Sequence, residues 1–200
     1  MRGRSAAPRR ANRVRIIGGT WRSRTLTFPD VPGLRPTPDR VRETLFNWLG
    51  QYLIGKRCLD LYAGSGALGF EALSRGAAAV VMVERSPRIW RALRDNAALL
   101  GARGVNLVRG DALEFLARTH GAAEFDLIFL DPPFGKGIPE GMWPQLLGRL
   151  SEGGQVYLES DAAFAGHPRL ELLKHGHAGA VYYHLLGRKR DDQGGLSGHV

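Results

Sequence analysis

Short apolar runs recur along the chain, separated by segments with helical spacing. Runs such as Val80-Val81-Met82-Val83 and Leu127-Ile128-Phe129-Leu130 are apolar at every position, which is typical of strands in a parallel sheet covered on both faces. Seven strands are predicted, at residues 57–62, 79–84, 105–109, 125–130, 155–159, 169–174 and 181–186. Their alternation with helices predicts an α/β fold, an open, mostly parallel seven-stranded sheet with helices on both faces.

Turn residues mark where the helices begin and end. Ser86 and Pro87 start a helix that Gly101 stops after Leu100, because serine caps helix N-termini and glycine adopts the left-handed turn that ends them. Further helices are predicted at residues 67–75, 112–118 and within 140–150. Residues 175–179 are predicted to join the last two strands as a hairpin turn.

Residues before the first sheet strand are predicted to form an N-terminal extension. Apolar residues on both sides of Gly18-Gly19 predict a small β-hairpin. Thr37 is predicted as the N-cap of the next helix and Pro38 as its first residue, with Arg40 and Arg42 off the apolar face. The predicted division is a basic flexible tail at 1–12, hairpin and helix at 13–56, a main domain at 57–190 and a loose tail at 191–200.

The net charge of +9 is concentrated at the N-terminus. Residues 1–43 hold eleven arginines and three acidic residues, whereas the remainder holds seventeen basic and sixteen acidic residues. A basic arm on a nearly neutral body is typical of proteins that bind RNA or DNA, although the first four arginines could equally belong to a solubilising tail. The single cysteine, Cys58, excludes an intrachain disulfide, and no apolar run suggests a membrane span, so a cytoplasmic protein without a membrane partner is expected.

A glycine loop follows the first sheet strand. Gly64, Gly66 and Gly69 match G-x-G-x-x-G between a strand ending near Asp60 and a helix starting near Ala67. Such a loop permits a tight turn, close approach of a nucleotide cofactor and close packing of helix on strand. The pattern also fits an ordinary strand-to-helix turn.

Acidic residues stand where three further strands end. Glu84 comes eighteen residues after Gly66, near the spacing at which a carboxylate binds ribose hydroxyls, although it could instead cap the next helix. Asp111 could lie beside an adenine or could N-cap the helix after it. Asp131 begins Asp-Pro-Pro-Phe, a rigid turn that offers a carboxylate, a carbonyl and an aromatic face to a planar base with an exocyclic amine.

The glycine loop and the Asp131 turn together resemble the S-adenosylmethionine-dependent methyltransferases that act on exocyclic amines. Three further segments, Arg15-Ile16-Ile17-Gly18-Gly19, residues 35–47 and residues 66–77, make the chain similar to the RsmD-type bacterial small-subunit (16S) ribosomal RNA guanine-N2 methyltransferases over residues 13–189. Tyr62 stands where that family usually has phenylalanine. The resemblance implies a Rossmann-like methyltransferase fold and a target in 16S ribosomal RNA, guanine 966 in that family.

The resemblance also implies roles for individual residues. The S-adenosylmethionine site would consist of Asp60, Tyr62, Gly64, Ser65, Gly66, Glu84, Asp111 and Ala112. The target-base site would consist of Asp131, Pro132, Pro133 and Phe134. RNA would contact Arg15, Arg22, Arg24, Arg35, Thr37, Arg40 and Arg42. The expected partner is 16S ribosomal RNA, within a small-subunit particle or naked, and the expected state is a monomer.

The sequence leaves three other functions open. An NAD-dependent oxidoreductase fits the glycine loop and Glu84 but leaves the Asp131 turn without a role. A non-catalytic RNA-binding module with a cofactor fold would need no reactive residues, and an amino-methyltransferase acting on adenine, cytosine or a glutamine amide would use the same turn. No metal site is predicted, since His175 and His177 lie on a predicted hairpin without other ligand-like residues.

Overall fold

The computed structural model describes residues 11–118, 124–133, 135, 137–139 and 141–189. The predicted tail at 191–200, most of the tail at 1–12, and Phe134 lie outside these residues. The first elements are β1 (Asn12–Arg15), β2 (Thr25–Phe28), α1 (Asp39–Leu49), β3 (Arg57–Asp60), α2 (Ala67–Ser74), β4 (Ala79–Glu84) and α3 (Pro87–Leu100). They are followed by β5 (Val105–Arg109), α4 (Ala112–Arg118), β6 (Phe125–Leu130), α5 (Met142–Arg149), β7 (Leu150–Ser160), β8 (Leu170–Ala178) and β9 (Val181–Arg188).

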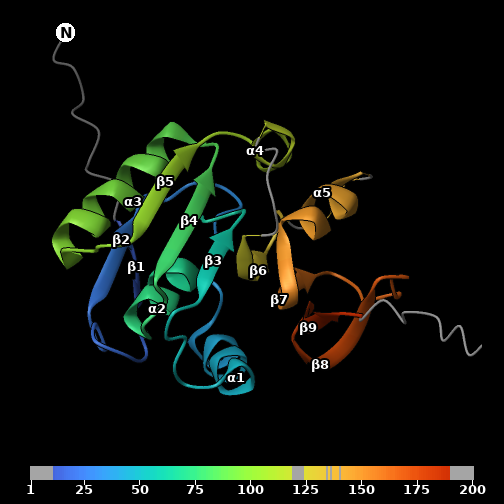
Figure 1. The fold of residues 1–200 in the computed structure, drawn as a ribbon. Helices are drawn as coiled ribbons and strands as arrows, with labels where there is room; N and C mark the ends of the chain where they lie inside the picture. Colours follow the sequence, from blue (N-terminus) through green and yellow to red (C-terminus); the bar gives the residue numbers. More distant parts are fainter. Residues whose placement is uncertain (1–10, 119–123, 134, 136, 140, 190–200) are drawn as a thin grey trace, which may run out of the picture.

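Seven strands form one sheet in the order β5-β4-β3-β6-β7-β9-β8, which confirms the predicted seven-stranded, mostly parallel sheet (Figure 1). The strands from β5 to β7 pair in parallel, and β9 pairs antiparallel with both β7 and β8. The predicted hairpin is also confirmed, since β1 and β2 pair antiparallel as a separate two-stranded sheet. The chain order reverses at β3, so β3 and β6 are neighbours.

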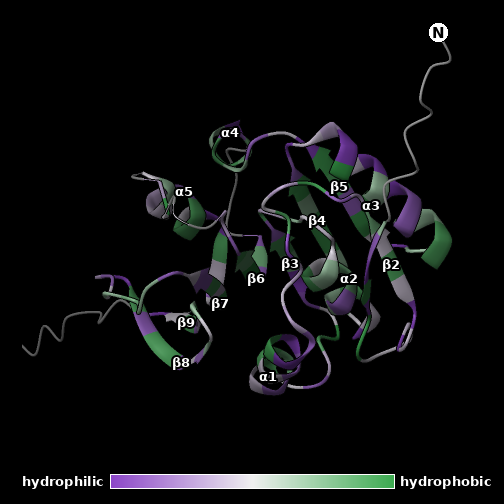
Figure 2. Cartoon of the chain, turned by 180° about the vertical axis from the view of Figure 1, so that it is seen from behind, coloured by the Kyte–Doolittle hydropathy of each residue, from purple (hydrophilic) through white to green (hydrophobic). Residues whose placement is uncertain are grey.

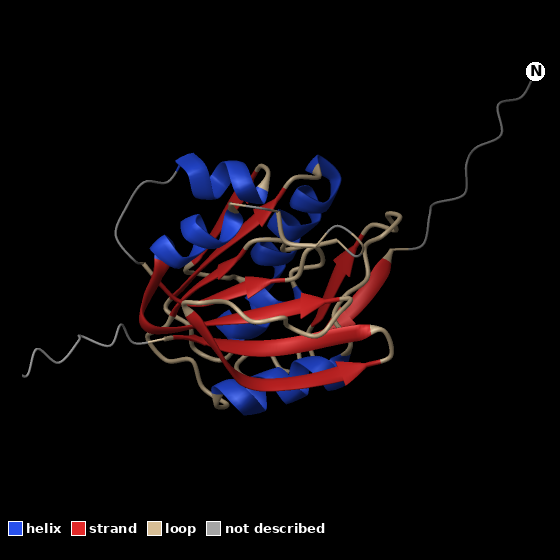
Figure 3. Cartoon of the chain, turned by 90° about the vertical axis from the view of Figure 1, so that its right-hand side faces the viewer, coloured by secondary structure: helices blue, strands red, loops and turns tan. Residues whose placement is uncertain are grey.

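Helices cover both sides of the sheet (Figure 3). On one side a core of buried residues joins the hairpin, α1, α2 and α3 to the strands, with Phe46, Phe70 and Phe129 near its centre. On the other side α4 and α5 pack over Leu59, Ile128 and their neighbours. In Figure 2, β4 and β6 are mostly hydrophobic, whereas α3 mixes hydrophilic and hydrophobic residues. None of the described helices is both long and apolar enough to cross a membrane.

Several element ends differ from the prediction. The first sheet strand ends at Asp60, because the residues after it turn away to form the glycine loop. β8 continues to Ala178, which leaves only a two-residue turn before β9. Helix α1 begins at Asp39 with Pro38 as its N-cap, and no side chain caps it. Thr37 is therefore not the predicted N-cap, and its side chain hydrogen-bonds to Glu159 instead.

Candidate active site

The carboxyl ends of β3, β4 and β6 meet at one edge of the sheet. β3 pairs in parallel with β4 on one side and with β6 on the other. In open α/β sheets, ligands bind in the crevice where the chain order reverses, which here is between β3 and β6. The structure therefore brings the glycine loop, Glu84 and the Asp131 turn to the same edge.

The glycine loop is fixed by its own backbone and by close packing. Gly64 and Gly66 have φ angles of 50° and 80°, a left-handed conformation that glycine adopts without strain. A Cβ on Gly66 would lie 2.7 Å from ring atoms of Phe70, and one on Gly69 would collide with Met82 of β4. Two of the three motif glycines are thus required by the packing of α2, independently of any ligand.

Glu84 holds the glycine loop from the neighbouring strand. Its Oε2 accepts a hydrogen bond from the backbone N–H of Gly64 at 3.1 Å, and its Oε1 accepts from Ser86 N–H at 2.7 Å. Burial raises the pKa of Glu84, while the two N–H groups favour its charged form. A carboxylate has further lone pairs, so these bonds leave acceptor capacity for ribose hydroxyls.

Asp60 is the most buried acidic group of the site. Its side chain is 2% exposed, and its Oδ2 has no hydrogen-bond partner within the described part of the chain. Burial raises the pKa of Asp60 to about 7, against the effect of backbone N–H groups of Gly69 and Tyr62. An unpaired buried carboxylate oxygen is costly, and the ammonium group at the methionine end of S-adenosylmethionine has the charge to pair with it.

The other predicted cofactor residues lie near the same edge. Asp111 N-caps α4, since its Oδ1 accepts from the N–H groups of Leu113 at 2.9 Å and Glu114 at 3.4 Å. Its role beside adenine stays a prediction, because capping alone explains these bonds. Ala112 and Ser65 are buried, and Tyr62 is half-buried.

The Asp131 turn follows β6 directly. Burial raises the pKa of Asp131 well above its ordinary value, and the carboxylates of Glu159 and Asp60 raise it further. Pro132 is buried and Pro133 is exposed. Both prolines line a small cavity of about 30 Å³ together with Ile138 and Glu159. Phe134, which was predicted to belong to the target-base site, lies outside the residues that the structure describes.

Glu159 is a candidate site residue that the sequence interpretation missed. It lies near the end of β7 and is 3% exposed. Its Oε1 accepts a hydrogen bond from the Tyr157 hydroxyl at 2.8 Å. The sequence does contain a signal for Glu159, because this residue ends the apolar run Val156-Tyr157-Leu158 in the same way that Glu84 ends the apolar run at 80–83. Among the described residues, no group of His, Cys, Asp or Glu side chains could hold a metal ion.

The predicted RNA-binding residues divide into exposed and buried ones. The side chain of Arg15 pairs with Asp39 at 2.8 Å, and Arg24 donates to the carbonyl of Leu99 at 3.1 Å. Arg15 and Thr37 also line a groove of about 350 Å³ between the hairpin and the segment before α1. The exposed members of the set are Arg15, Arg22, Arg24, Arg35 and Arg40.

Arg42 was wrongly predicted to contact RNA. Its side chain is fully buried, at 0% exposure, and donates to Glu71 at 3.2 Å and to Asp39 at 2.7 Å. It also donates to the carbonyls of Thr37 and Arg15. Every one of these partners is part of the protein, so Arg42 is a structural residue.

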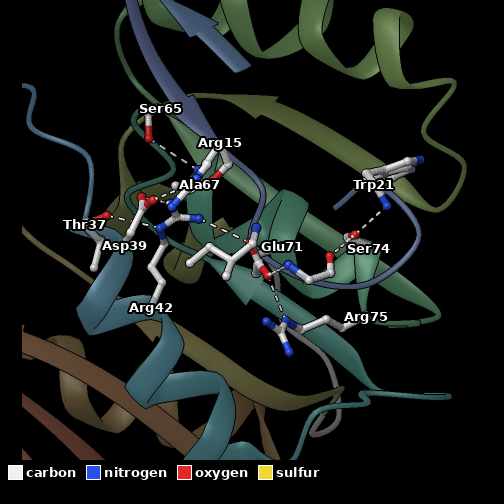
Figure 4. Close-up of polar contacts among 12 residues, drawn as sticks. Arg15, Trp21, Thr37, Asp39, Arg42, Ser65, Ala67, Glu71, Ser74 and Arg75 are labelled. Carbon is white, nitrogen blue, oxygen red and sulfur yellow. Dashed lines mark hydrogen bonds and ion pairs between the residues drawn. The ribbon is translucent and has the colours of Figure 1, made fainter. Parts of the chain in front are cut away.

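Glu71 of α2 connects the hairpin to the helices of the main domain (Figure 4). Its two carboxylate oxygens accept hydrogen bonds from the N–H groups of Ile17 and Gly18, each at 2.8 Å. The same carboxylate lies between the guanidinium groups of Arg42 and Arg75. Because α2 starts at the glycine loop, this network fixes the basic hairpin relative to the predicted cofactor site.

The strand order, the glycine loop and the acidic strand ends define a Rossmann-like protein of the S-adenosylmethionine-dependent methyltransferase class. The chain belongs to the RsmD family, and residues 14–187 match the family described as "Conserved hypothetical protein 95". Ribosomal RNA small subunit methyltransferase D of Escherichia coli (strain K12) is 42% identical over 185 residues, which cover 90% of this chain and 92% of that protein. These comparisons confirm the family that the sequence resemblance indicated.

Two solved structures extend the comparison. One, described as "Putative methyltransferase yhhF from Escherichia coli", has a TM-score of 0.79 and 41% identity, covering 90% of this chain and 100% of that one. The other is the T. thermophilus 16S rRNA N2 G1207 methyltransferase (RsmC) in complex with AdoMet and guanosine. Its TM-score is 0.66 at 26% identity, covering 90% of this chain and 50% of that one.

Proposed function

We propose that this protein transfers a methyl group from S-adenosylmethionine to the N2 amine of a guanine in 16S ribosomal RNA of the small subunit. The observation that carries the proposal is the position of the Asp131 turn, at the end of the strand next to the glycine-loop strand. The name of the Escherichia coli relative supports the small ribosomal subunit as the substrate. The guanosine bound to RsmC supports guanine N2 as the acceptor.

Four residues of this chain are proposed to hold the cofactor. The carboxylate of Asp60 would pair with the methionine ammonium group, and Glu84 would accept from the ribose hydroxyls. Gly64 and Gly66 would let the ligand approach the loop backbone closely, because neither has a side chain. The bound cofactor would supply an electrophilic methyl group on a positively charged sulfur.

The Asp131 turn is proposed to position the acceptor amine. The N2 lone pair of guanine is delocalised into the ring, so the amine is a poor nucleophile. If Asp131 and the Pro132 carbonyl each accept one N2–H, the lone pair is directed at the methyl carbon, and this orientation lowers the barrier. As the N–C bond forms the amine must lose a proton, and Asp131, whose pKa is raised by burial, is suited to accept it. Phe134 would stack on the base.

The basic hairpin and the segment before α1 are proposed to hold the RNA backbone. Arg15, Arg22, Arg24, Arg35 and Arg40 are exposed, and arginine binds phosphate oxygens with charge-assisted hydrogen bonds. The network around Glu71 keeps the hairpin at a fixed position relative to α2. An RNA strand bound along the hairpin would therefore place its target nucleotide at a fixed position relative to the edge of the sheet where β3 and β6 end.

Methyl transfer to ribosomal RNA tests this proposal directly. The protein is incubated with tritiated S-adenosylmethionine and with small subunits, or naked 16S RNA, from a strain that lacks the modification, and the labelled nucleotide is mapped. Label on a guanine N2 is expected, at guanine 966 if the family target applies. Label on another base, or no label with either RNA substrate, would refute the proposal. Calorimetric titration with S-adenosylmethionine and with NADH would separate a methyltransferase from an oxidoreductase.

A further inference from the structure

Glu159 and Asp131 occupy equivalent places on adjacent strands. Leu130 of β6 and Leu158 of β7 are partners in the parallel register, so the residue that follows each of them is Asp131 and Glu159 respectively. The two strands lie next to each other in the sheet (Figure 1). Glu159 also lines the small cavity beside Pro132 and Pro133. A base held by the Asp131 turn would therefore have the Glu159 carboxylate close to its edge.

The structure holds Glu159 as a hydrogen-bond acceptor. The Tyr157 hydroxyl donates to its Oε1 at 2.8 Å, and the Thr37 side chain forms a second hydrogen bond. Burial and the nearby Glu159 charge raise the pKa of Tyr157 well above its ordinary value, so the phenol remains a donor. None of the ion pairs within the described part of the chain includes Glu159. A buried carboxylate without a basic partner is costly, which favours a role for it in binding.

The donors and acceptors on the Watson–Crick edge of each base determine which base such an acceptor would bind. In adenine and cytosine, the ring nitrogen next to the exocyclic amine is an acceptor on the Watson–Crick edge. In guanine, N1 beside the amine carries a hydrogen and is a donor. A second fixed carboxylate beside Asp131 therefore matches guanine, whereas it would face the lone pair of adenine N1 or cytosine N3 without a hydrogen bond.

We propose that Glu159 accepts the N1–H of the target guanine, and that this contact makes the enzyme specific for guanine among the bases with an exocyclic amine. The inference rests on the proposed function and deepens it. Asp131 would bind the amine that reacts, and Glu159 would read the neighbouring ring nitrogen. Tyr157 and Thr37 would act as positioning residues, because they contact Glu159 and hold its carboxylate in place.

The test compares two small-subunit RNA substrates that differ at the target nucleotide, one with guanosine and one with 2-aminopurine ribonucleoside introduced by ligation. 2-Aminopurine keeps the amine on C2, but its N1 has no hydrogen. For the wild-type protein, kcat/KM is expected to be at least about a hundredfold lower on 2-aminopurine, since a site built to bind a donor rejects a base without it. In Glu159→Gln, kcat/KM on the guanosine substrate should fall at least about tenfold. The ratio of kcat/KM on guanosine to that on 2-aminopurine should narrow or reverse, because the glutamine amide can donate a hydrogen bond to N1 of 2-aminopurine.

A matched variant controls for the loss of a negative charge. Glu152→Gln changes an exposed glutamate on the same strand, and both substrates should keep their wild-type rates. An unchanged guanosine to 2-aminopurine ratio in Glu159→Gln would overturn the inference, as would equal wild-type rates on the two bases. If Glu159→Gln does not fold, Tyr157→Phe replaces it and should narrow the ratio by a smaller factor, and an unchanged ratio there overturns the inference as well.

The outcomes separate the two proposals. If the wild-type protein methylates neither RNA, the proposed function fails. If it methylates guanosine but discriminates against 2-aminopurine independently of Glu159, only the assignment of Glu159 fails.

Discussion

The guanidinium group of Arg42 lies 3.2 Å from the carboxylate of Glu71, and both side chains are fully buried. The pair connects α1 to α2, and Glu71 also accepts the N–H groups of Ile17 and Gly18 from the hairpin. Three parts of the chain that are distant in sequence therefore depend on one carboxylate. The pair explains why an arginine in a basic block can be structural instead of contacting RNA.

Replacement of Glu71 by alanine should destabilise the protein strongly. It removes the carboxylate that pairs with Arg42 and Arg75 and accepts the N–H groups of Ile17 and Gly18. Loss of one partner of a buried ion pair costs about 3–5 kcal/mol. For a chain of this length, the melting temperature should fall on the order of 10 °C. Glu114→Ala, which removes a surface ion pair with Arg118, is the control and should shift the melting temperature little. Similar small shifts in both variants would contradict the prediction.

Asp60 should make stability depend on pH. Its pKa is about 7 in the folded protein because of burial and about 4 in an unfolded chain. The folded state then binds more protons in this range, so the contribution of Asp60 to stability is complete below about pH 4 and is lost as the pH rises to about 7. In urea denaturation, Asp60→Asn should gain stability relative to wild type by about 2–3 kcal/mol between pH 5 and pH 8. A difference that stays constant with pH would show that Asp60 does not titrate in this range.

Replacement of Asp131 by alanine should affect catalysis far more than cofactor binding. The residue is proposed to position the acceptor amine and accept its proton, so methyl transfer should fall by about a hundredfold or more. The Kd for S-adenosylmethionine, measured by calorimetry, should change by less than about threefold, since Asp131 lies outside the proposed cofactor residues. Asp95→Ala, at an exposed position on α3, should behave as wild type. Equal losses in both measurements would count against the assigned role.

Two exposed arginines should contribute to RNA binding through phosphate contacts. Arg22→Ala and Arg35→Ala should each weaken binding, and each should lower the slope of log Kd against log salt by about 0.7–0.9 if one phosphate contact is lost. Arg118→Ala provides a charge-matched control on α4, which packs on the opposite side of the sheet from the hairpin. The same change of slope in the control would show a general charge effect in place of a binding face.

Local sequence patterns were sufficient for most of the fold. The strands β4, β5 and β6 have the predicted bounds. For the largely buried strands β4 and β6 this is expected, because strands covered on both faces give continuous apolar runs. Arg42 was misplaced because its partner Glu71 is 29 residues away in the sequence, and helical spacing alone does not indicate an ion pair between two helices. Glu159 was recognisable as an acidic strand end, but its importance depends on the pairing of β6 with β7, which only the sheet order establishes.

The hairpin contributes Val14, Ile16, Leu26 and Phe28 to the buried core that it shares with α1, α2 and α3. The segment assigned to RNA binding is thus also part of the folding unit. A chain shortened to begin at residue 57 would expose this apolar surface to water and leave Glu71 without its backbone donors. We expect such a chain to aggregate, so the proposed contribution of the hairpin to RNA recognition has to be measured with surface point variants of the whole 200-residue chain.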